Sequence, residues 1–155
     1  PPPGVEIRIH PLDDLPLYNG DLEHDRRPAG VDALNTAVAS ADALVFFSPE
    51  YNTSLPAVTK NAIDWLSREP KAWTDKVTTI VSASPGSRAG IGARDHFASI
   101  MSWMTASFTG ETLGLGHYAD RFDPEDDAVV APATVVELQQ FLARVSDLAA
   151  QGVQE

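Results

Sequence analysis

The sequence predicts one α/β domain in which a parallel β-sheet carries helices on both faces. Strand-like and helix-like segments alternate along the chain, as parallel sheets with crossover helices require. Residues 43–48 form an almost continuous apolar run, and residues 76–84 form a second segment of the same buried type. The helix-like segments are apolar on one side only, so we expect them to cover the sheet.

The first half of the chain contains two expected strands, each followed by a helix. Residues 5–9 alternate apolar and polar side chains, which is typical of a strand with one neighbour and a partly wet face. A loop rich in Pro, Asp and Gly leads to residues 30–41, whose apolar side chains recur at helical spacing. The strand at 43–48 follows, and apolar residues between 55 and 66 share one face of the next helix.

The second half continues this alternation. Residues 76–84 predict a strand, the Gly-rich turn 85–92 follows it, and residues 91–104 predict a helix. A short strand is expected within residues 107–118, and residues 134–150 predict the last helix.

The last helix is expected to begin with a capping box, because Thr134 and Glu137 have the spacing of that motif. No internal repeat, low-complexity tract or linker interrupts the chain. We therefore expect residues 1–155 to form a single domain.

The composition excludes several classes of function. The net charge of −11 disfavours binding to nucleic acid or to an anionic membrane surface. The chain has no cysteine, which excludes disulfides, cysteine nucleophiles and thiolate metal sites and is compatible with a cytoplasmic location. No apolar window approaches the roughly 18 residues of a membrane span. None of the four histidines has metal-ligand spacing with another, so no metal site is expected.

Two loops are the candidate binding site. The tetrad Pro49-Glu50-Tyr51-Asn52 follows the strand at 43–48, and the Gly-rich turn follows the strand at 76–84. Ligands of open α/β sheets bind beyond the carboxyl ends of the strands, which is where both loops are expected to lie.

Three stretches carry a resemblance to a known family. The sequence SPEYNTSLPAVTKNAIDWLSR, residues 48–68, closely resembles the signature of the NADPH-dependent FMN reductase family. DLPLYNGDLE, residues 14–23, and SASPGSRAGIGARDHF, residues 82–97, resemble two further loops of that family. The resemblance covers nearly the whole chain and implies a flavodoxin-like three-layer fold with the sheet order 2-1-3-4-5.

The family resemblance implies an FMN-dependent NAD(P)H oxidoreductase. Its acceptor would be a quinone, an azo compound or a similar small molecule, and the protein would be a homodimer or tetramer. The resemblance also implies that the two loops hold the isoalloxazine ring, with the cofactor-binding residues Pro49, Glu50, Tyr51, Asn52, Ser82, Ser84, Gly86 and Gly90. No catalytic side chain is expected, because the cofactor carries the hydride chemistry.

The start of the sequence departs from the family pattern. The family begins with a strand and a loop that holds the FMN phosphate, and nothing in this sequence matches them. Residues 5–9 resemble the family's second strand, which pairs only with the first. We therefore expect the chain to be an excerpt that lacks its N-terminal strand, loop and helix, or another segment to fill the gap.

Other interpretations of the same residues stay open. The tetrad could be a turn that starts a helix, with Ser54 near the N-cap. His96 falls within a helical pattern and suits a structural role. At the level of the whole chain, a flavin-binding electron carrier without a nicotinamide site and a flavin-free interaction domain are the alternatives.

Overall fold

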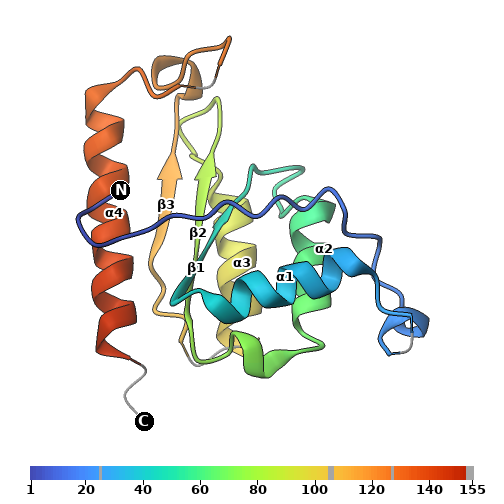
Figure 1. Ribbon diagram of the computed structural model, residues 1–155. Helices are drawn as coiled ribbons and strands as arrows, with labels where there is room; N and C mark the ends of the chain where they lie inside the picture. The colour runs from blue at the N-terminus through green and yellow to red at the C-terminus, as the bar shows by residue number, and fades with distance from the viewer. Residues whose placement is uncertain (25, 105–106, 127, 153–155) are drawn as a thin grey trace.

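Three parallel strands form the sheet of this protein (Figure 1). The computed structural model describes residues 1–24, 26–104, 107–126 and 128–152. The strands lie in the order β1-β2-β3 and are β1 (Ala43–Phe47), β2 (Val77–Ala83) and β3 (Thr112–Leu115). The α-helices are α1 (Ala29–Ser40), α2 (Ala57–Leu66), α3 (Ile91–Met104) and α4 (Pro132–Gln151). Within the described residues, no helix has the length and apolarity to cross a membrane.

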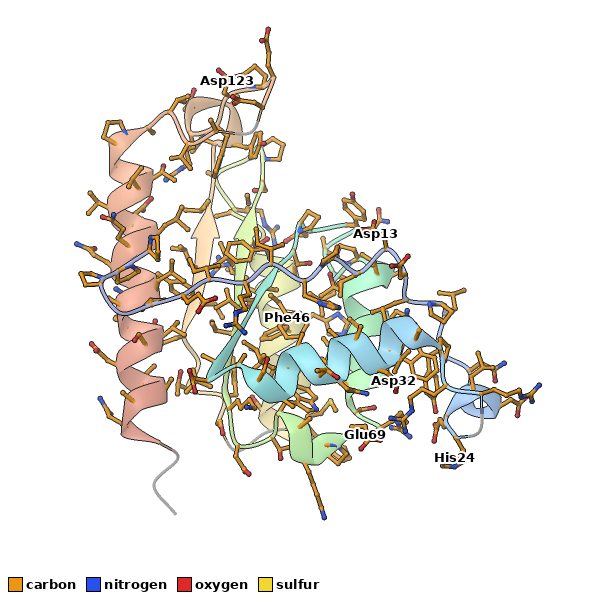
Figure 2. All side chains as sticks on the ribbon, viewed as in Figure 1. Asp13, His24, Asp32, Phe46, Glu69 and Asp123 are labelled. Atoms are coloured by element: carbon orange, nitrogen blue, oxygen red, sulfur yellow. The ribbon has the colours of Figure 1, made fainter. Side chains whose placement is uncertain are left out.

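Apolar side chains pack on both faces of the sheet. Successive residues of β2 point to opposite faces, so Ile80 and Val81 belong to different clusters. The Ile80 cluster joins α1, α2 and α3 to the sheet, and Phe46 of β1 packs against it (Figure 2). The ring centroids of Phe46 and Phe97 lie 5.2 Å apart. The Val81 cluster joins the sheet to α4 through Phe141. The predicted fold class, an α/β sheet covered on both faces, is confirmed.

β1 is only half-buried, in contrast to the predicted burial on both faces. Each residue of β2 from Val77 to Ser82 is buried, whereas Phe47 at the end of β1 is 64% exposed. The reason is position in the sheet, because β2 lies between two strands and β1 has a described partner on one side only.

The predicted strand at residues 5–9 is wrong. These residues form no strand, and the N-terminal segment crosses in front of all three strands (Figure 1). Ile7 is 47% exposed and Ile9 is 90% exposed. Alternation of apolar and polar residues is typical of a strand with one buried face, but a strand also needs a neighbouring strand for its backbone hydrogen bonds. The observed order β1-β2-β3 matches strands 3, 4 and 5 of the predicted order 2-1-3-4-5. The full order is not confirmed.

The predicted capping box at Thr134 and Glu137 is also wrong. α4 begins at Pro132, so Thr134 already lies in its first turn. Its Oγ1 accepts a hydrogen bond from Arg121 Nη1 at 2.8 Å, and Glu137 Oε2 accepts one from the same nitrogen at 2.5 Å. Both side chains therefore hold the loop after β3 instead of capping the helix.

Candidate functional site

The carboxyl ends of the three strands bring three loops together. Backbone bonds continue each ladder into the loops, from Ser48 N to Val81 O and from Ser84 N to Leu115 O, both at 3.0 Å. Tyr118 N donates to Ser84 O at 3.1 Å and joins the third loop to the second. Both sequence-predicted loops therefore lie at one edge of the sheet, the upper edge in Figure 1.

The tetrad leads into a tight turn. Tyr51 N and Ser54 O, and Ser54 N and Tyr51 O, are paired at 3.0 Å. The two residues between them have positive φ, 50° at Asn52 and 62° at Thr53, as in a type I′ turn. The turn presents Tyr51, which is 61% exposed, at the surface. It is not the start of a helix, because α2 begins three residues after Ser54 and its N-cap is Pro56.

Residues with strained backbone conformations cluster at this edge of the sheet. Among the described residues, four residues other than glycine have positive φ: Asn52, Thr53, Ala89 and His117. They are distributed over the loops that follow β1, β2 and β3. Such conformations cost about 1–3 kcal/mol each and cluster at functional sites, which favours this edge as the site.

The Glu50 side chain crosses from the tetrad to α3. Its Oε2 accepts hydrogen bonds from Gly92 N at 2.6 Å and from Ala93 N at 3.3 Å, in the first turn of that helix. A Cβ at Gly92 would lie 2.6 Å from Thr53 O, so the turn and the helix are in close contact. The carboxylate is thus already engaged by the backbone of the chain.

The predicted residues of the second loop occupy different depths. Ser82 is fully buried, and its Oγ has no hydrogen-bond partner among the described residues. A Cβ at Gly90 would lie 1.9 Å from that oxygen, so Gly90 covers Ser82. Ser84 Oγ donates to Gly86 O at 3.1 Å, and Gly86 is exposed with open space above it.

Uncharged donors line both loops. In the described part of the chain, the backbone N–H groups of Glu50, Asn52, Gly86, Ser87 and Arg88 donate to no backbone or side-chain acceptor. A flavin ring presents carbonyl oxygens and ring nitrogens that accept hydrogen bonds from such groups. The donor set therefore fits a flavin ring, and a chain with net charge −11 needs local donors of this kind to bind an anionic cofactor.

Two contacts at the site were missed by the sequence analysis. Ser54 Oγ and His96 Nδ1 lie 2.6 Å apart and join the tetrad turn to the second turn of α3. Arg94 donates to Ala89 O at 3.3 Å and to Thr112 Oγ1 at 3.2 Å, and so ties the second loop to β3. No sequence pattern signals the first contact, because its partners are 42 residues apart.

A cavity of about 330 Å³ lies beside the loop after β3 and not at the two predicted loops. Arg121, Thr134 and Glu137 are among its lining residues. Arg121 donates to Gly116 O at 2.7 Å as well as to the other two, so its guanidinium anchors the loop. We assign no ligand to this cavity.

Comparison with known proteins identifies the family. The NADPH-dependent FMN reductase family matches residues 2–120, more than half of the chain. The chain belongs to this family. Its predicted family, its fold class and its activity as an FMN-dependent NAD(P)H oxidoreductase are thereby confirmed, with FMN and NAD(P)H as its cofactors.

Three similar proteins illustrate the membership. A probable NADPH:quinone oxidoreductase 2 of Oryza sativa subsp. japonica is 36% identical over 143 residues, which cover 90% of this chain and 70% of that protein. A quinone reductase of Escherichia coli strain K12 is 34% identical over 86% of this chain and 73% of its own length. The solved structure of the flavoenzyme NAD(P)H:(acceptor) oxidoreductase FerB from Paracoccus denitrificans has a TM-score of 0.81 at 28% identity. That match covers 96% of this chain and 82% of FerB.

The second half of the family signature, KNAIDW, has a structural role in this chain. Asn61 Nδ2 and Trp65 Nε1 donate to the same carbonyl, Pro16 O, at 2.9 and 2.8 Å. Tyr18 N donates to Asn61 Oδ1 at 2.8 Å. α2 therefore holds the loop that contains DLPLYN by three hydrogen bonds, and this contact is called the latch below.

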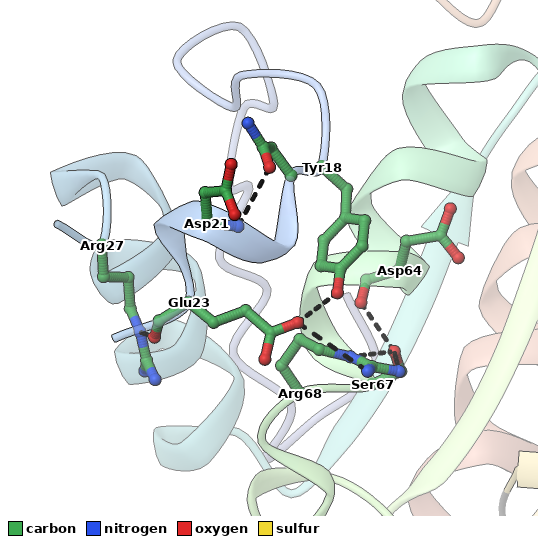
Figure 3. Close-up of polar contacts among 8 residues, drawn as sticks. Tyr18, Asp21, Glu23, Arg27, Asp64, Ser67 and Arg68 are labelled. Carbon is green, nitrogen blue, oxygen red and sulfur yellow. Dashed lines mark hydrogen bonds and ion pairs between the residues drawn. The ribbon is translucent and has the colours of Figure 1, made fainter. Parts of the chain in front are cut away.

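Charged side chains extend this latch (Figure 3). The Tyr18 hydroxyl donates to Glu23, and the Arg68 guanidinium lies 5.6 Å from the centre of the Tyr18 ring. The hydrogen bond to Glu23 is the main cause that raises the pKa of Tyr18 above its usual 10.0. This network holds the loop at the far side of α2 and does not belong to the two candidate cofactor loops.

Proposed function

We propose that the two loops hold the flavin ring of an enzyme that reduces quinones or similar small acceptors with NAD(P)H. FMN, when bound, supplies the chemistry that accepts a hydride from NAD(P)H and passes it to the acceptor. The protein orients the ring, keeps one of its faces open to both substrates and supplies hydrogen bonds without net charge. The observation that carries the proposal is the set of free backbone N–H donors on both loops.

The eight predicted residues would divide this work between them. Backbone N–H groups of Glu50, Asn52 and Gly86 would donate to the edge of the ring. The exposed Tyr51 offers an apolar ring face, and Gly86 leaves room for close approach. The remaining members would fix the shape of the two loops, and they are Pro49, Ser82, Ser84 and Gly90.

The acceptor is proposed from the relatives. Quinone reduction appears in the names of the rice and Escherichia coli proteins, which supports a quinone as the natural acceptor. Azo compounds present a similar conjugated acceptor and form the second class to test.

We also propose a cytoplasmic homodimer or tetramer. Exposed apolar side chains on α2 and α3 support self-association: Val58 is 49%, Ile91 39% and Trp103 90% exposed. A cysteine-free chain suits a reducing cytoplasm, which also supplies NAD(P)H.

A further strand, loop and helix would complete the domain. The described sheet leaves one edge of β1 unpaired, and unpaired strand edges recruit another strand. We propose that such a strand pairs there and that its loop holds the FMN phosphate, since helix N-termini with free N–H groups are the usual phosphate sites.

A visible absorption spectrum tests the proposal. The purified protein is expected to bind FMN, and the flavin bands are expected to bleach with NADPH under anaerobic conditions and to return on addition of a benzoquinone. Flavin bands that NADPH leaves unchanged would favour an electron carrier. NADPH oxidation that does not respond to FMN, or no flavin binding at all, would overturn the proposal.

A further inference from the structure

We propose that the Glu50 side chain is a positioning residue that sets the separation of the two flavin loops through the backbone of α3. The inference rests on the proposed function, because it concerns how the proposed site is held. Glu50 would therefore act on the flavin in two distinct ways, by its backbone N–H directly and by its carboxylate indirectly.

The carboxylate forms a direct tether between the two loops. Glu50 lies in the loop after β1, whereas Gly92 and Ala93 belong to the helix that follows the loop after β2. Glu50 Oε2 accepts hydrogen bonds from Gly92 N at 2.6 Å and from Ala93 N at 3.3 Å, and these residues lie 42 and 43 positions further along the chain. The two bonds also satisfy two of the N–H groups that a helix leaves unpaired at its start.

The charge of Glu50 suits this location. α3 has 14 residues, and its N-terminus carries a partial positive charge that favours a carboxylate. No acidic residue lies in the first turn of α3 itself. Glu50 therefore supplies, from another loop, the negative charge that often stabilises a helix N-terminus from within the helix. An ionised acceptor also makes a stronger bond than a neutral one.

A second tether keeps the tetrad turn against the same helix. The Ser54 hydroxyl and His96 Nδ1 lie 2.6 Å apart, one turn further along α3 than Gly92. Between the two tethers, Thr53 O packs so closely on Gly92 that a Cβ there would approach it to 2.6 Å. The turn with positive φ at Asn52 and Thr53 is therefore held at both ends.

Loss of the Glu50 tether would change the distance between the backbone N–H donors of the two loops. The free N–H groups of Glu50 and Asn52 belong to one loop, and those of Gly86, Ser87 and Arg88 belong to the other. A ring that spans both loops binds tightly only if their spacing is fixed in advance, because ordering them at binding costs free energy.

The test compares Glu50→Ala and Glu50→Gln with the unchanged protein. In the ligand-free protein, amide hydrogen exchange at residues 50–54 and 86–93 is expected to accelerate in Glu50→Ala and less in Glu50→Gln, which keeps an acceptor oxygen. The FMN Kd is expected to rise about 10- to 100-fold in Glu50→Ala, the equivalent of about one lost charge-assisted bond. The visible circular dichroism of bound FMN is expected to change, since the ring would sit differently.

Glu69→Ala is the matched control, because Glu69 pairs with Arg27 at 2.7 Å away from both loops. It is expected to leave exchange in the two loops and the flavin signal unchanged. The inference is overturned if Glu50→Ala leaves exchange and circular dichroism as they are, or if Glu69→Ala changes them equally. If Glu50→Ala does not fold, Glu50→Gln carries the same comparison.

Failure of the proposed function would look different from failure of this inference. If the unchanged protein bound no FMN, the proposed function would fall, whereas hydrogen exchange in the ligand-free protein would still test the tether. If the unchanged protein bound FMN and reduced quinones while Glu50→Ala matched it in exchange, affinity and circular dichroism, only the positioning role would fall.

Discussion

Gly90→Ala is expected to lower the free energy of unfolding by about 2–5 kcal/mol. Gly90 has φ of +68°, where a side chain costs roughly 1–2 kcal/mol. The new Cβ would also lie 1.9 Å from Ser82 Oγ and 2.7 Å from Ser82 Cβ. Ser82 is fully buried on β2, so relief requires a shift of the loop or the strand, and such overpacking typically costs about 1–3 kcal/mol.

Urea unfolding of a small set of variants tests this reasoning. Ser82→Ala combined with Gly90→Ala removes the 1.9 Å contact but leaves the 2.7 Å contact and the positive φ, so recovery should be partial. Ser82→Gly combined with Gly90→Ala removes both contacts, so it should reduce the destabilising effect of Gly90→Ala further. Gly86→Ala is the matched control, because no atom lies within 4 Å of its Cβ position, and its effect should stay within about 0.5 kcal/mol. Each double variant is compared with its Ser82 single variant. A Gly90→Ala protein as stable as Gly86→Ala, or a loss from Gly90→Ala that is as large in the Ser82 variants as in the unchanged protein, would refute the packing argument.

Three further outcomes are expected. Ser82→Ala alone should raise the free energy of unfolding by about 1 kcal/mol, because a buried hydroxyl without a partner is costly, and a urea titration measures it. Asn61→Ala should lower the unfolding free energy by about 1–3 kcal/mol and speed amide exchange at Tyr18, whose N–H loses its acceptor; unchanged exchange there would contradict the latch. The raised pKa of Tyr18 means that its bond to Glu23 contributes stability below pH 10.0, and that this contribution disappears as the pH rises through the folded-state pKa. Unfolding measured from neutral to alkaline pH should show this loss in the unchanged protein and not in Tyr18→Phe.

The sequence by itself determined the elements that depend on local periodicity and the identity of the family. The four long helices lie within two residues of their predicted bounds, because a 3.6-residue apolar repeat already encodes both the helix and its buried face. The strands at 43–48 and 76–84 were predicted from their apolar runs, which are equally local, and the two candidate loops were predicted because they directly follow these strands. The signature at residues 48–68 indicated the family that the match over residues 2–120 confirms.

The tertiary structure decided every feature that depends on a partner distant in sequence. Residues 5–9 form no strand, since alternation supplies a face but not the neighbouring backbone. Glu50 caps a helix 42 residues away, and Ser54 bonds His96 across the same separation. Thr134 and Glu137 hydrogen-bond Arg121 and do not cap α4, because the helix begins three residues earlier than a capping box at these positions implies. Local patterns carry no information about such pairings, because they form only when the folded chain brings distant segments together.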